Sequence, residues 1–342
     1  MSNTSTMKAI GFDRSLPIQA SNSLFMFDAA YPEAAPYDLI VKVSAASVNP
    51  VDAKVRVRAA ADGSLETPRV LGYDAVGTVV EVGASVTGFE VGSRVYYAGE
   101  INRAGSNARY QAVDSRLVGK APVTLGDAEA AALPLTALTG WEALFDRLRI
   151  GPDDADKTLL VIGGAGGVGS ITIQLAKQLT RLRVIATASR PESAAWCRSM
   201  GADHIADHVD LVKSVRALGI ETVDYILNAA DTIVHWDAMA ELIAPQGTIC
   251  SIVEFDGGVD LTKLQGKSAG FVWELMFTRS LFKTADIAKQ ADILDQVSRL
   301  ADQGKLRSTL MKTLAGFTVE SFKMAHQEIE SGKTIGKISI TY

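Results

Sequence analysis

The stretch Thr158-Leu-Leu-Val-Ile162, followed by Gly163-Gly-Ala-Gly-Gly-Val-Gly169, decides the fold. A continuous apolar run of this length is typical of a strand buried on both faces of a parallel sheet. The glycines have the G-x-G-x-x-G spacing of a loop that turns tightly, approaches a pyrophosphate and packs a helix on a strand. The stretch predicts a dinucleotide site formed by Gly164, Ala165, Gly166, Gly167, Val168 and Gly169; the alternative is a glycine-rich turn without a ligand.

Strands and helices alternate on the carboxyl side of this loop. Such alternation predicts right-handed crossovers and hence a Rossmann fold, an α/β doubly wound parallel sheet. The expected helices are 168–179, 191–200, 209–218 and 233–243, and the expected strands are 183–188, 203–205, 223–227 and 248–253. Gly201, between a helix and a strand, fits a helix C-cap.

The sequence before residue 124 has a different pattern. Short runs with period two, separated by glycine and proline, predict antiparallel strands at 38–45, 76–82, 92–97 and 108–113, without a long helix. Helical spacing begins at 137–148, and the end of the chain predicts a strand at 271–277, helices at 287–303 and 317–331, and a strand at 337–341. We therefore expect a dinucleotide-binding domain at 126–275 and a β-rich domain formed by 1–125 and 276–342.

The coenzyme is predicted from the end of the second Rossmann strand. Dinucleotide sites for NAD usually place an acidic residue there to bind the ribose hydroxyls. Here Ser189 and Arg190 follow the strand, and no acidic residue occurs before Glu192. A hydroxyl and a guanidinium suit a 2′-phosphate, so NADPH is the predicted coenzyme. The alternative is that Arg190 is only a solvated residue at a helix start.

Composition excludes several classes of protein. With 342 residues, 47% hydrophobic and 21% charged, the chain is long and apolar enough for two globular domains. The net charge of −5 and the lack of a basic stripe exclude a nucleic-acid partner, and no apolar run is long enough to span a membrane. Two cysteines cannot form a disulfide framework, and the first six residues do not resemble a signal peptide, so we expect a cytoplasmic protein.

Five motifs together resemble the medium-chain dehydrogenase/reductase superfamily, in particular its quinone oxidoreductase branch and the group called zinc-type alcohol dehydrogenase-like proteins. They are Ser47-Val-Asn-Pro-Val-Asp52, Leu71-Gly-Tyr-Asp-Ala-Val-Gly77, Leu133-Pro-Leu-Thr-Ala-Leu-Thr-Gly-Trp141, the glycine loop and Gly332-Lys-Thr-Ile-Gly-Lys337. The resemblance covers nearly the whole chain. It implies a GroES-like catalytic domain beside the Rossmann domain. It also implies a homo-oligomer, a dimer or alternatively a tetramer, that pairs through the edge strand near 271–277.

The zinc ligands of the superfamily are missing from this sequence. The resemblance places them near Val48–Asn49, at Tyr73-Asp74 and at Leu135, where neither cysteine nor histidine occurs. The segment 97–110, which corresponds to the structural zinc lobe, also lacks cysteine. Because one carboxylate cannot hold a tetrahedral zinc site, we predict no metal.

The resemblance also supplies candidate site residues. It places Asn49 and Asp52 at the floor of the catalytic site and puts Tyr73 where zinc enzymes have histidine, which makes Tyr73 the first candidate for a proton donor. Lys54 replaces the tyrosine usual in quinone reductases, so the identity of the acid stays open. For the coenzyme the implied contacts are Thr139, Asn228, Ile252, Val253 and Lys337. Each residue has an ordinary structural alternative as a cap, a turn, packed core or solvated surface.

Hydride transfer without zinc needs another way to stabilise charge on the substrate oxygen, which favours conjugated acceptors. The sequence therefore predicts a zinc-independent oxidoreductase that transfers hydride from NADPH to a quinone or an α,β-unsaturated carbonyl compound. Two alternatives stay open: a zinc-type alcohol or carbonyl dehydrogenase with an altered metal site, and a non-catalytic NADPH-binding redox sensor. The acceptor cannot be named from the sequence.

Overall fold

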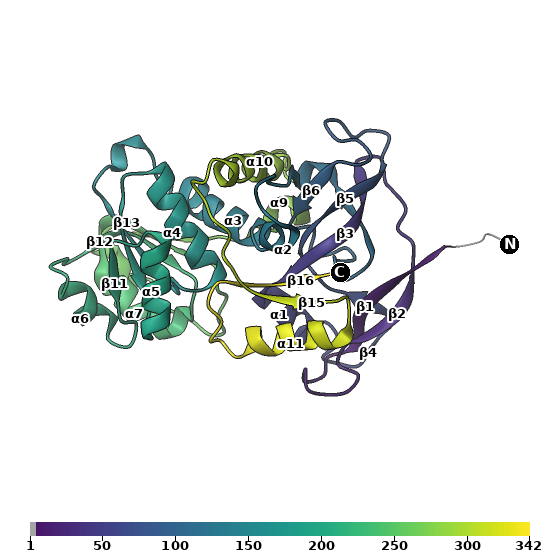
Figure 1. Cartoon of the computed structure of the whole chain (residues 1–342). Coiled ribbons are helices and arrows are strands. Elements are labelled where there is room, and N and C mark those ends of the chain that lie inside the picture. Colours follow the sequence, from purple (N-terminus) through teal and green to yellow (C-terminus); the bar gives the residue numbers. More distant parts are fainter. Residues whose placement is uncertain (1–4) are drawn as a thin grey trace. The chain divides into compact units, whose positions relative to one another are not determined.

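The computed structural model describes residues 5–342 and divides the chain into two compact units (Figure 1). The first unit runs to Leu135 and resumes at Phe277 through Tyr342. The second unit comprises Thr136–Met276. We refer to them as the catalytic unit and the nucleotide unit.

The nucleotide unit is built on a six-stranded parallel sheet in the order β11-β10-β9-β12-β13-β14. This is the strand order of a Rossmann sheet, in which the first strand, β9, lies at the centre and the order of the strands reverses beside it. Its strands are β9 Thr158–Ile162, β10 Arg183–Thr187, β11 His204–Ala206, β12 Val223–Asn228, β13 Ile243–Ser251 and β14 Gly270–Trp273. Its helices are α4 Gly167–Leu179, α5 Pro191–Met200, α6 Leu211–Arg216, α7 Thr232–Leu242 and α8 Thr262–Gln265.

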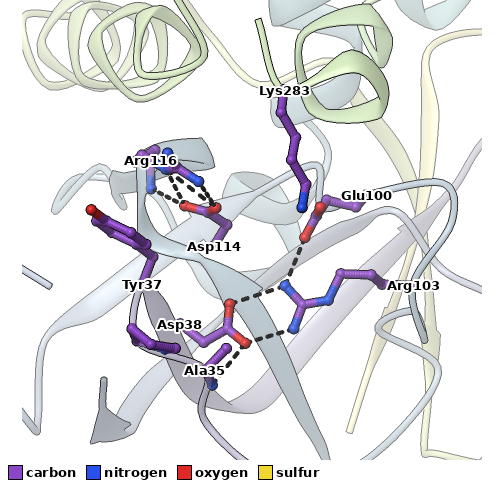
Figure 2. A pocket seen from close by; sticks show the side chains of 9 residues that line it. Ala35, Tyr37, Asp38, Glu100, Arg103, Asp114, Arg116 and Lys283 are labelled. Atoms are coloured by element: carbon purple, nitrogen blue, oxygen red, sulfur yellow. Dashed lines mark hydrogen bonds and ion pairs between the residues drawn. The ribbon is translucent and has the colours of Figure 1, made fainter. Parts of the chain in front are cut away.

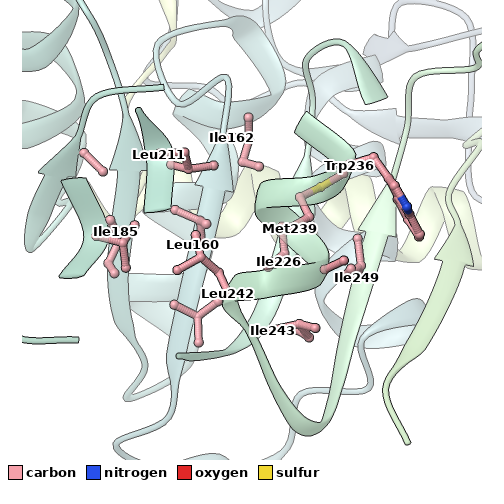
Figure 3. Close-up of a cluster of buried hydrophobic side chains, with 14 of the residues drawn as sticks. Leu160, Ile162, Ile185, Leu211, Ile226, Trp236, Met239, Leu242, Ile243 and Ile249 are labelled. Carbon is pink, nitrogen blue, oxygen red and sulfur yellow. The ribbon is translucent and has the colours of Figure 1, made fainter. Parts of the chain in front are cut away.

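Strand β9 is buried at every position, as its continuous apolar sequence predicts. Figure 3 shows Leu160 and Ile162 of this strand among branched side chains of the neighbouring strands, with Trp236, Met239 and Leu242 of α7 packed over them. This apolar core packs closely around β9 and holds the strand in place within the sheet. It therefore also fixes the position at which the glycine loop leaves the sheet.

The catalytic unit contains two sheets. Strands β2, β1 and β4 form a small antiparallel sheet, and a larger one has the order β15-β16-β3-β5-β6-β8, with β7 paired to β3. The strands are β1 Thr6–Arg14, β2 Phe25–Ala30, β3 Asp38–Val48, β4 Ser64–Val70, β5 Asp74–Val82, β6 Arg94–Tyr97, β7 Tyr110–Asp114, β8 Val118–Lys120, β15 Leu310–Ala315 and β16 Lys337–Thr341. The helices are α1 Pro50–Arg58, α2 Asp127–Ala131, α9 Thr278–Phe282, α10 Lys289–Asp302 and α11 Val319–Glu330, and α3 Pro134–Trp141 leads into the nucleotide unit.

Most predicted elements are confirmed. The strands expected at 38–45, 76–82, 92–97 and 108–113 correspond to β3, β5, β6 and β7, and the expected Rossmann alternation corresponds to β9–β13 and α4–α7. Gly201 ends α5 in the left-handed conformation, with φ 109°, as the C-cap prediction requires.

A short helix of nine residues, α1, interrupts the strands of the amino-terminal half, where the sequence predicts no long helix. This helix begins after Asn49 and has Pro50 at its first position. A capping box stabilises its amino-terminal end, where the Asp52 side chain accepts a hydrogen bond from the Asn49 N–H at 2.8 Å. The segment contains three basic residues and shows no apolar stripe. The cap therefore indicates the helix, whereas the hydrophobic periodicity does not.

Two further expectations are corrected, and one strand lies outside the predicted elements. The helix predicted at 137–148 is α-helical only to Trp141 and continues as a π-turn, η2 Glu142–Arg147. The strand predicted at 271–277 is β14, Gly270–Trp273, because the chain leaves the sheet at Glu274. Strand β15 was not predicted; it lies parallel to β16, and its alternation is broken by exposed polar positions.

The first domain boundary also differs from the sequence expectation, which put residues 126–135 in the nucleotide-binding domain. In the structure these residues belong to the catalytic unit. Their backbone is bonded to that unit: Ser339 Oγ donates to the Ala128 carbonyl at 2.7 Å, and Ser308 Oγ donates to the Glu129 carbonyl at 2.9 Å. The alanine-rich composition marks a helix here, but the helix packs on the β-rich sheet.

Residues 1–4 lie outside the described residues, so the sequence interpretation of the extreme amino terminus is not addressed by the fold. Between residues 5 and 342, none of the helices combines the length and the apolar character needed to cross a bilayer.

His326 of α11 yields a prediction about acid stability. Its ring is fully buried, both ring nitrogens lack a hydrogen-bond partner, and burial lowers its pKa to about 3, with the Arg56 guanidinium contributing. The unfolded chain protonates a histidine near pH 6.5, so this histidine by itself should lower the free energy of unfolding by about 1.4 kcal/mol per pH unit below that value. We expect His326→Leu to remove this acid-induced loss in urea unfolding measured between about pH 7 and pH 5.

The matched control is His204→Leu, at a partly exposed position of β11, which should leave the pH dependence unchanged. An unaltered acid-induced loss in His326→Leu would show that this histidine is not the group responsible.

Candidate functional site

The glycine loop lies between β9 and α4, and its backbone is fixed locally. Gly163 has φ 82°, a left-handed conformation that favours glycine, and its N–H donates to Thr187 Oγ1 at 3.0 Å. The Gly166 N–H donates to the Gly163 carbonyl at 3.2 Å, and Gly166 is the N-cap of α4. The first N–H groups of α4 therefore follow the loop directly, in the arrangement that binds a diphosphate.

The first and third fingerprint glycines, Gly164 and Gly169, are required by close packing. A Cβ on Gly169 would lie 2.3 Å from the Gly163 carbonyl oxygen and 2.7 Å from the Gly164 Cα. A Cβ on Gly164 would lie 2.7 Å from the Ala186 Cβ of β10. Since both contacts involve backbone or a β-carbon, neither can relax by rotation of a flexible side chain.

Ser189 and Arg190 lie at the carboxyl end of β10, and both are exposed. Arg190 immediately precedes α5, where its backbone N–H donates to Ser193 Oγ at 3.2 Å and its carbonyl accepts from the same hydroxyl at 2.9 Å. This reciprocal cap fixes the backbone of Arg190, which leaves the two exposed side chains at the end of the strand next to the glycine loop.

The predicted ribose and nicotinamide contacts form a polar cluster at the ends of β12 and β13. Asn228 is fully buried, and its amide donates to Ser251 Oγ at 3.1 Å and to Thr232 Oγ1 at 3.0 Å. Thr232 in turn donates to the Val253 carbonyl at 2.7 Å, and the Ile252 N–H donates to the Asn228 carbonyl at 3.1 Å. The Asn228 side chain therefore holds the Ile252–Val253 backbone in place, a role that its position in the sequence did not reveal.

Thr139 lies in the helix that precedes the π-turn, and it is buried. The following residue, Gly140, packs against α4, since a Cβ there would lie 2.7 Å from Thr172 Oγ1. The Thr-Gly pair thus brings this helix close to the helix that begins at the glycine loop.

The catalytic unit contains a second polar cluster, which is almost completely buried. Asp52 accepts the Asn49 N–H at 2.8 Å and the Gly72 N–H at 3.0 Å, one with each carboxylate oxygen. Gly72 has φ 101°, and a Cβ on it would lie 2.4 Å from the Ser106 hydroxyl. The next residue is Tyr73, so Asp52 fixes the turn that presents Tyr73.

Asp74 is the centre of this cluster, and sequence reasoning did not select it as a site residue. It accepts from Asn49 Nδ2 at 2.8 Å, from the Leu135 N–H at 2.7 Å and from Lys337 Nζ at 3.1 Å. Strand register explains the meeting: β3 pairs with β16 at Val48↔Ile338 and with β5 at Ser47↔Asp74. A signal was present in the sequence, because an acid opens the largely apolar strand β5 and a lysine opens the largely apolar strand β16.

Burial governs the ionisation of the two aspartates. It raises the pKa of Asp52 to about 7, opposed by the Asn49 N–H and the Lys337 ammonium and reinforced by the Asp74 charge. Burial also raises the pKa of Asp74, while Lys337 and Asn49 favour its ionised form. The cluster therefore contains a carboxyl group that exchanges its proton near neutral pH.

Tyr73 lies beside this cluster with only 2% of its surface exposed. Its ring packs edge-on against Phe277, with 5.2 Å between centroids. Burial and the nearby Asp52 charge raise its pKa, so the phenol keeps its proton at all physiological pH values and can donate a hydrogen bond.

The two predicted lysines differ in position. Lys54 is half-buried on α1. Because it comes two residues after Asp52, its side chain leaves the helix on a different side from that of Asp52. Lys337 does not have the partners expected of a coenzyme contact: its ammonium donates to the Val48 carbonyl at 3.0 Å, to Asp74 and to Asn49 Oδ1. All three of its N–H donors are taken inside the catalytic unit, because β16 starts opposite the end of β3.

The side chains at the superfamily's zinc positions do not fit that metal. Asn49, Tyr73 and Leu135 provide neither thiolate nor imidazole, and Asp74 is held by an ammonium and two N–H groups. Among the residues that the structure describes, no group of three or more His, Cys, Asp or Glu side chains is arranged to hold a metal ion. We therefore derive no step through zinc.

A separate cavity of about 300 Å³ lies in the catalytic unit (Figure 2). Arg103 bridges Asp38 and Glu100 across it, with its shortest contact 2.7 Å to Asp38 Oδ2, and Arg116 is paired with Asp114. Lys283 extends toward Glu100 in the same view. The cavity contains no predicted site residue, and its carboxylates are neutralised by its own arginines.

Comparisons with known proteins agree with this geometry. Residues 35–130 match the alcohol dehydrogenase GroES-like domain, and residues 200–340 match the zinc-binding dehydrogenase family. A zinc-type alcohol dehydrogenase-like protein of Staphylococcus aureus (strain MSSA476) is 41% identical over 98% of this chain and 99% of its own length. The chain belongs to the medium-chain dehydrogenase/reductase superfamily.

Solved structures agree with this membership. A structure from Rhizobium etli CFN 42, named as a zinc-dependent alcohol dehydrogenase protein, is 44% identical with a TM-score of 0.94, over 99% of this chain and 98% of that one. The quinone oxidoreductase of Coxiella burnetii is 25% identical with a TM-score of 0.79, over 99% and 100% of the two chains.

A partial relative is also informative. The NADPH-dependent alkenal/one oxidoreductase of Arabidopsis thaliana is 39% identical over 52% of this chain and 46% of its own. As a medium-chain dehydrogenase/reductase with an intact glycine loop, the chain is an oxidoreductase that uses a nicotinamide dinucleotide.

The buried ion pair yields a stability prediction. Lys337→Met should destabilise the protein by about 3–5 kcal/mol, because it leaves the Asp74 carboxylate buried without a cation. The double variant Asp74→Asn/Lys337→Met should recover part of this loss, since a neutral amide does not need a counterion. Urea unfolding measures both effects.

Lys312→Met is the matched control, because Lys312 pairs with Glu328 on the surface of the same unit. It should cost no more than about 1 kcal/mol. Equal losses in the two lysine variants would contradict the importance of the buried pair.

Proposed function

We propose that this chain is a zinc-independent reductase that uses NADPH to reduce a conjugated acceptor, a quinone or an α,β-unsaturated carbonyl compound. One observation carries the proposal: the dinucleotide loop is intact, whereas the superfamily's zinc positions are Asn49, Tyr73 and Leu135. Such a chain can bind the coenzyme but must stabilise the substrate oxygen by hydrogen bonding.

The preference for a conjugated acceptor follows from the chemistry of those positions. The dinucleotide, when bound, supplies the hydride. Neutral donors stabilise a developing oxyanion less than a metal ion does, so an acceptor that delocalises the charge is favoured. Tyr73 is the proposed donor, since its phenol stays protonated, and Asp52 positions it through the Gly72 N–H. Asn49 orients the buried cluster, and Lys54 is the alternative acid.

The names of two relatives support the same acceptor class. The Arabidopsis relative is an alkenal/one oxidoreductase and is NADPH-dependent, and the Coxiella neighbour is a quinone oxidoreductase. Other relatives carry zinc-type or zinc-dependent names, so an alcohol or carbonyl dehydrogenase is the second candidate.

We also propose a cytoplasmic homodimer. The edge strand β14 carries Trp273, which is 48% exposed and forms one aromatic group with Phe255 and Phe271. An exposed aromatic edge strand is unfavourable in water, and a second copy of the same strand would cover it.

An acceptor panel tests the activity. With NADPH in excess, we expect turnover of benzoquinones or enones at kcat/KM at least about a hundredfold above that of the matched saturated aldehydes, a ratio that corresponds to about 2.7 kcal/mol of transition-state stabilisation. Tyr73→Phe should lower kcat more than it changes KM. Preference for saturated aldehydes would instead favour the second candidate, and binding of NADPH without turnover of any acceptor would favour a sensor.

Coenzyme choice gives a separate prediction. Arg190→Ala should weaken NADPH binding by about tenfold to a hundredfold, because a charged hydrogen bond to phosphate contributes about 1.5–3 kcal/mol. The affinity for NADH, which lacks the 2′-phosphate, should change little. Isothermal titration calorimetry measures both dissociation constants.

Arg198→Ala removes another exposed arginine of α5 and serves as the control. A parallel loss of NADH and NADPH affinity in Arg190→Ala would refute a specific role of Arg190 in coenzyme choice.

A further inference from the structure

The nucleotide unit contains a cluster of charged side chains that the proposed chemistry does not use. Glu142 and Glu274 are both buried, whereas 30% of the Arg147 side chain is exposed. Arg147 Nε lies 2.8 Å from Glu274 Oε2, and Arg147 Nη2 lies 3.9 Å from Glu142 Oε2. Two acidic groups therefore face one guanidinium in the interior of the unit.

The π-turn η2 brings two of these residues together. Its bonding pattern spans five residues, as the Leu148 N–H donating to the Ala143 carbonyl at 2.9 Å shows. In such a turn, residues five apart lie nearly above one another, so Glu142 and Arg147 share a side of the helix. In a regular α-helix their side chains would diverge.

Charge balance requires one proton on the pair. Two carboxylates beside one guanidinium would leave a net negative charge buried, which is strongly unfavourable. The neighbouring Cys250 thiol does not supply the balance, because burial and the Glu274 charge raise its pKa and keep it neutral. One carboxyl group must therefore be protonated, and it can then donate a hydrogen bond to the other.

The electrostatics of Glu274 agree with a shared proton. Burial, followed by the charge of Glu142, raises the pKa of Glu274 to about 9, against the opposing effect of Arg147. A hydrogen bond with the Glu142 side chain also favours the protonated form. The pair as a whole thus retains its proton at neutral pH.

The pair connects two segments of the nucleotide unit. Glu142 lies one turn after Thr139 on the same helix, and Glu274 directly follows β14. The Glu274 N–H donates to the Ser251 carbonyl at 3.0 Å, and Ser251 Oγ accepts from the Asn228 amide. A continuous set of hydrogen bonds thus leads from the carboxyl pair to the backbone that precedes Ile252 and Val253.

We propose that Glu142 and Glu274 share one proton beside Arg147 and are positioning residues that hold the Thr139 helix against the end of β13. The positioning role rests on the proposed function, in which Thr139 and the Ile252–Val253 backbone contact the nicotinamide half of the coenzyme. When the proton leaves at alkaline pH, the carboxylates repel one another and the two segments separate, which weakens coenzyme binding.

The shared proton is tested without coenzyme. Because the folded pKa of the pair lies above the unfolded value, the contribution of the pair to stability is greatest at acid pH and falls as pH rises toward about 9. The unfolding equilibrium constant of the wild type should rise about tenfold per pH unit between about pH 7 and pH 9. Glu142→Gln, whose amide donates the same hydrogen bond without titrating, should lose this dependence, and so should Glu274→Gln.

Infrared spectroscopy gives an independent readout. The wild type at about pH 8 should show the carbonyl band of buried carboxylic acid, and both glutamine variants should lose the contribution of one carboxyl group to it, whereas any contribution of Asp52 and Asp74 stays. The control Glu221→Gln replaces an exposed acid of the same unit and should leave both the band and the pH dependence as in the wild type. A band of undiminished intensity in Glu142→Gln and Glu274→Gln would overturn the shared proton.

The positioning role is tested by calorimetric titration of NADPH at about pH 7 and about pH 9.5, on either side of the pKa. Wild-type affinity should fall by at least about fivefold between these values, Glu142→Gln should change by less than about twofold, and Glu142→Ala should bind weakly at both. Equal pH dependence in wild type and Glu142→Gln would refute positioning. Failure of every variant to bind NADPH would refute the proposed function and the positioning role, whereas the unfolding profile would still decide the shared proton.

Discussion

The ion pair between Lys337 and Asp74 is the constraint on which the catalytic unit depends. A buried charge is tolerated only when it is paired and its remaining hydrogen bonds are satisfied. Both conditions hold: Asp74 also accepts from Asn49 Nδ2 and the Leu135 N–H, and Lys337 also donates to the Val48 carbonyl. The pair joins the last strand of the chain to β3 and β5, so the position of Tyr73, next to Asp74, follows from it.

The nucleotide unit is controlled by two different constraints. At the glycine loop, the backbone must approach so closely that a β-carbon on Gly169 would meet a carbonyl oxygen. At the end of β13, hydrogen bonds from Asn228 and Thr232 fix the Ile252–Val253 backbone. The first constraint is steric and independent of pH, whereas the Glu142–Glu274 pair adds one that depends on a proton.

The elements predictable from the sequence are those whose signals are local. The glycine spacing, the apolar run of β9 and the alternation that follows it are read within a few dozen residues, and the Rossmann sheet was predicted from them. The features that the sequence did not predict depend on interactions other than hydrophobic periodicity. Asp74 acquires its importance from a lysine 263 residues away, and the helix α1 depends on a cap rather than a stripe.

Other errors have similar causes. Residues 126–135 have helical composition, but their assignment to the catalytic unit depends on hydrogen bonds from Ser308 and Ser339, far away in the sequence. The π-turn cannot be recognised from periodicity, because Glu142 and Arg147 are brought together by a helical distortion that pairs residues five apart. The partners of Lys337, which the resemblance implies as a coenzyme contact, depend on strand register, and its own segment does not show that register.

The central claim is that this medium-chain dehydrogenase/reductase transfers hydride without zinc, because Asn49, Tyr73 and Leu135 replace the metal ligands. The most direct measurement is the zinc content per chain of a purified sample whose NADPH-dependent turnover is determined before and after chelation. The account predicts less than about 0.1 zinc per chain and turnover that chelation does not change. About one zinc per chain, with activity lost on its removal and restored on its return, would contradict it.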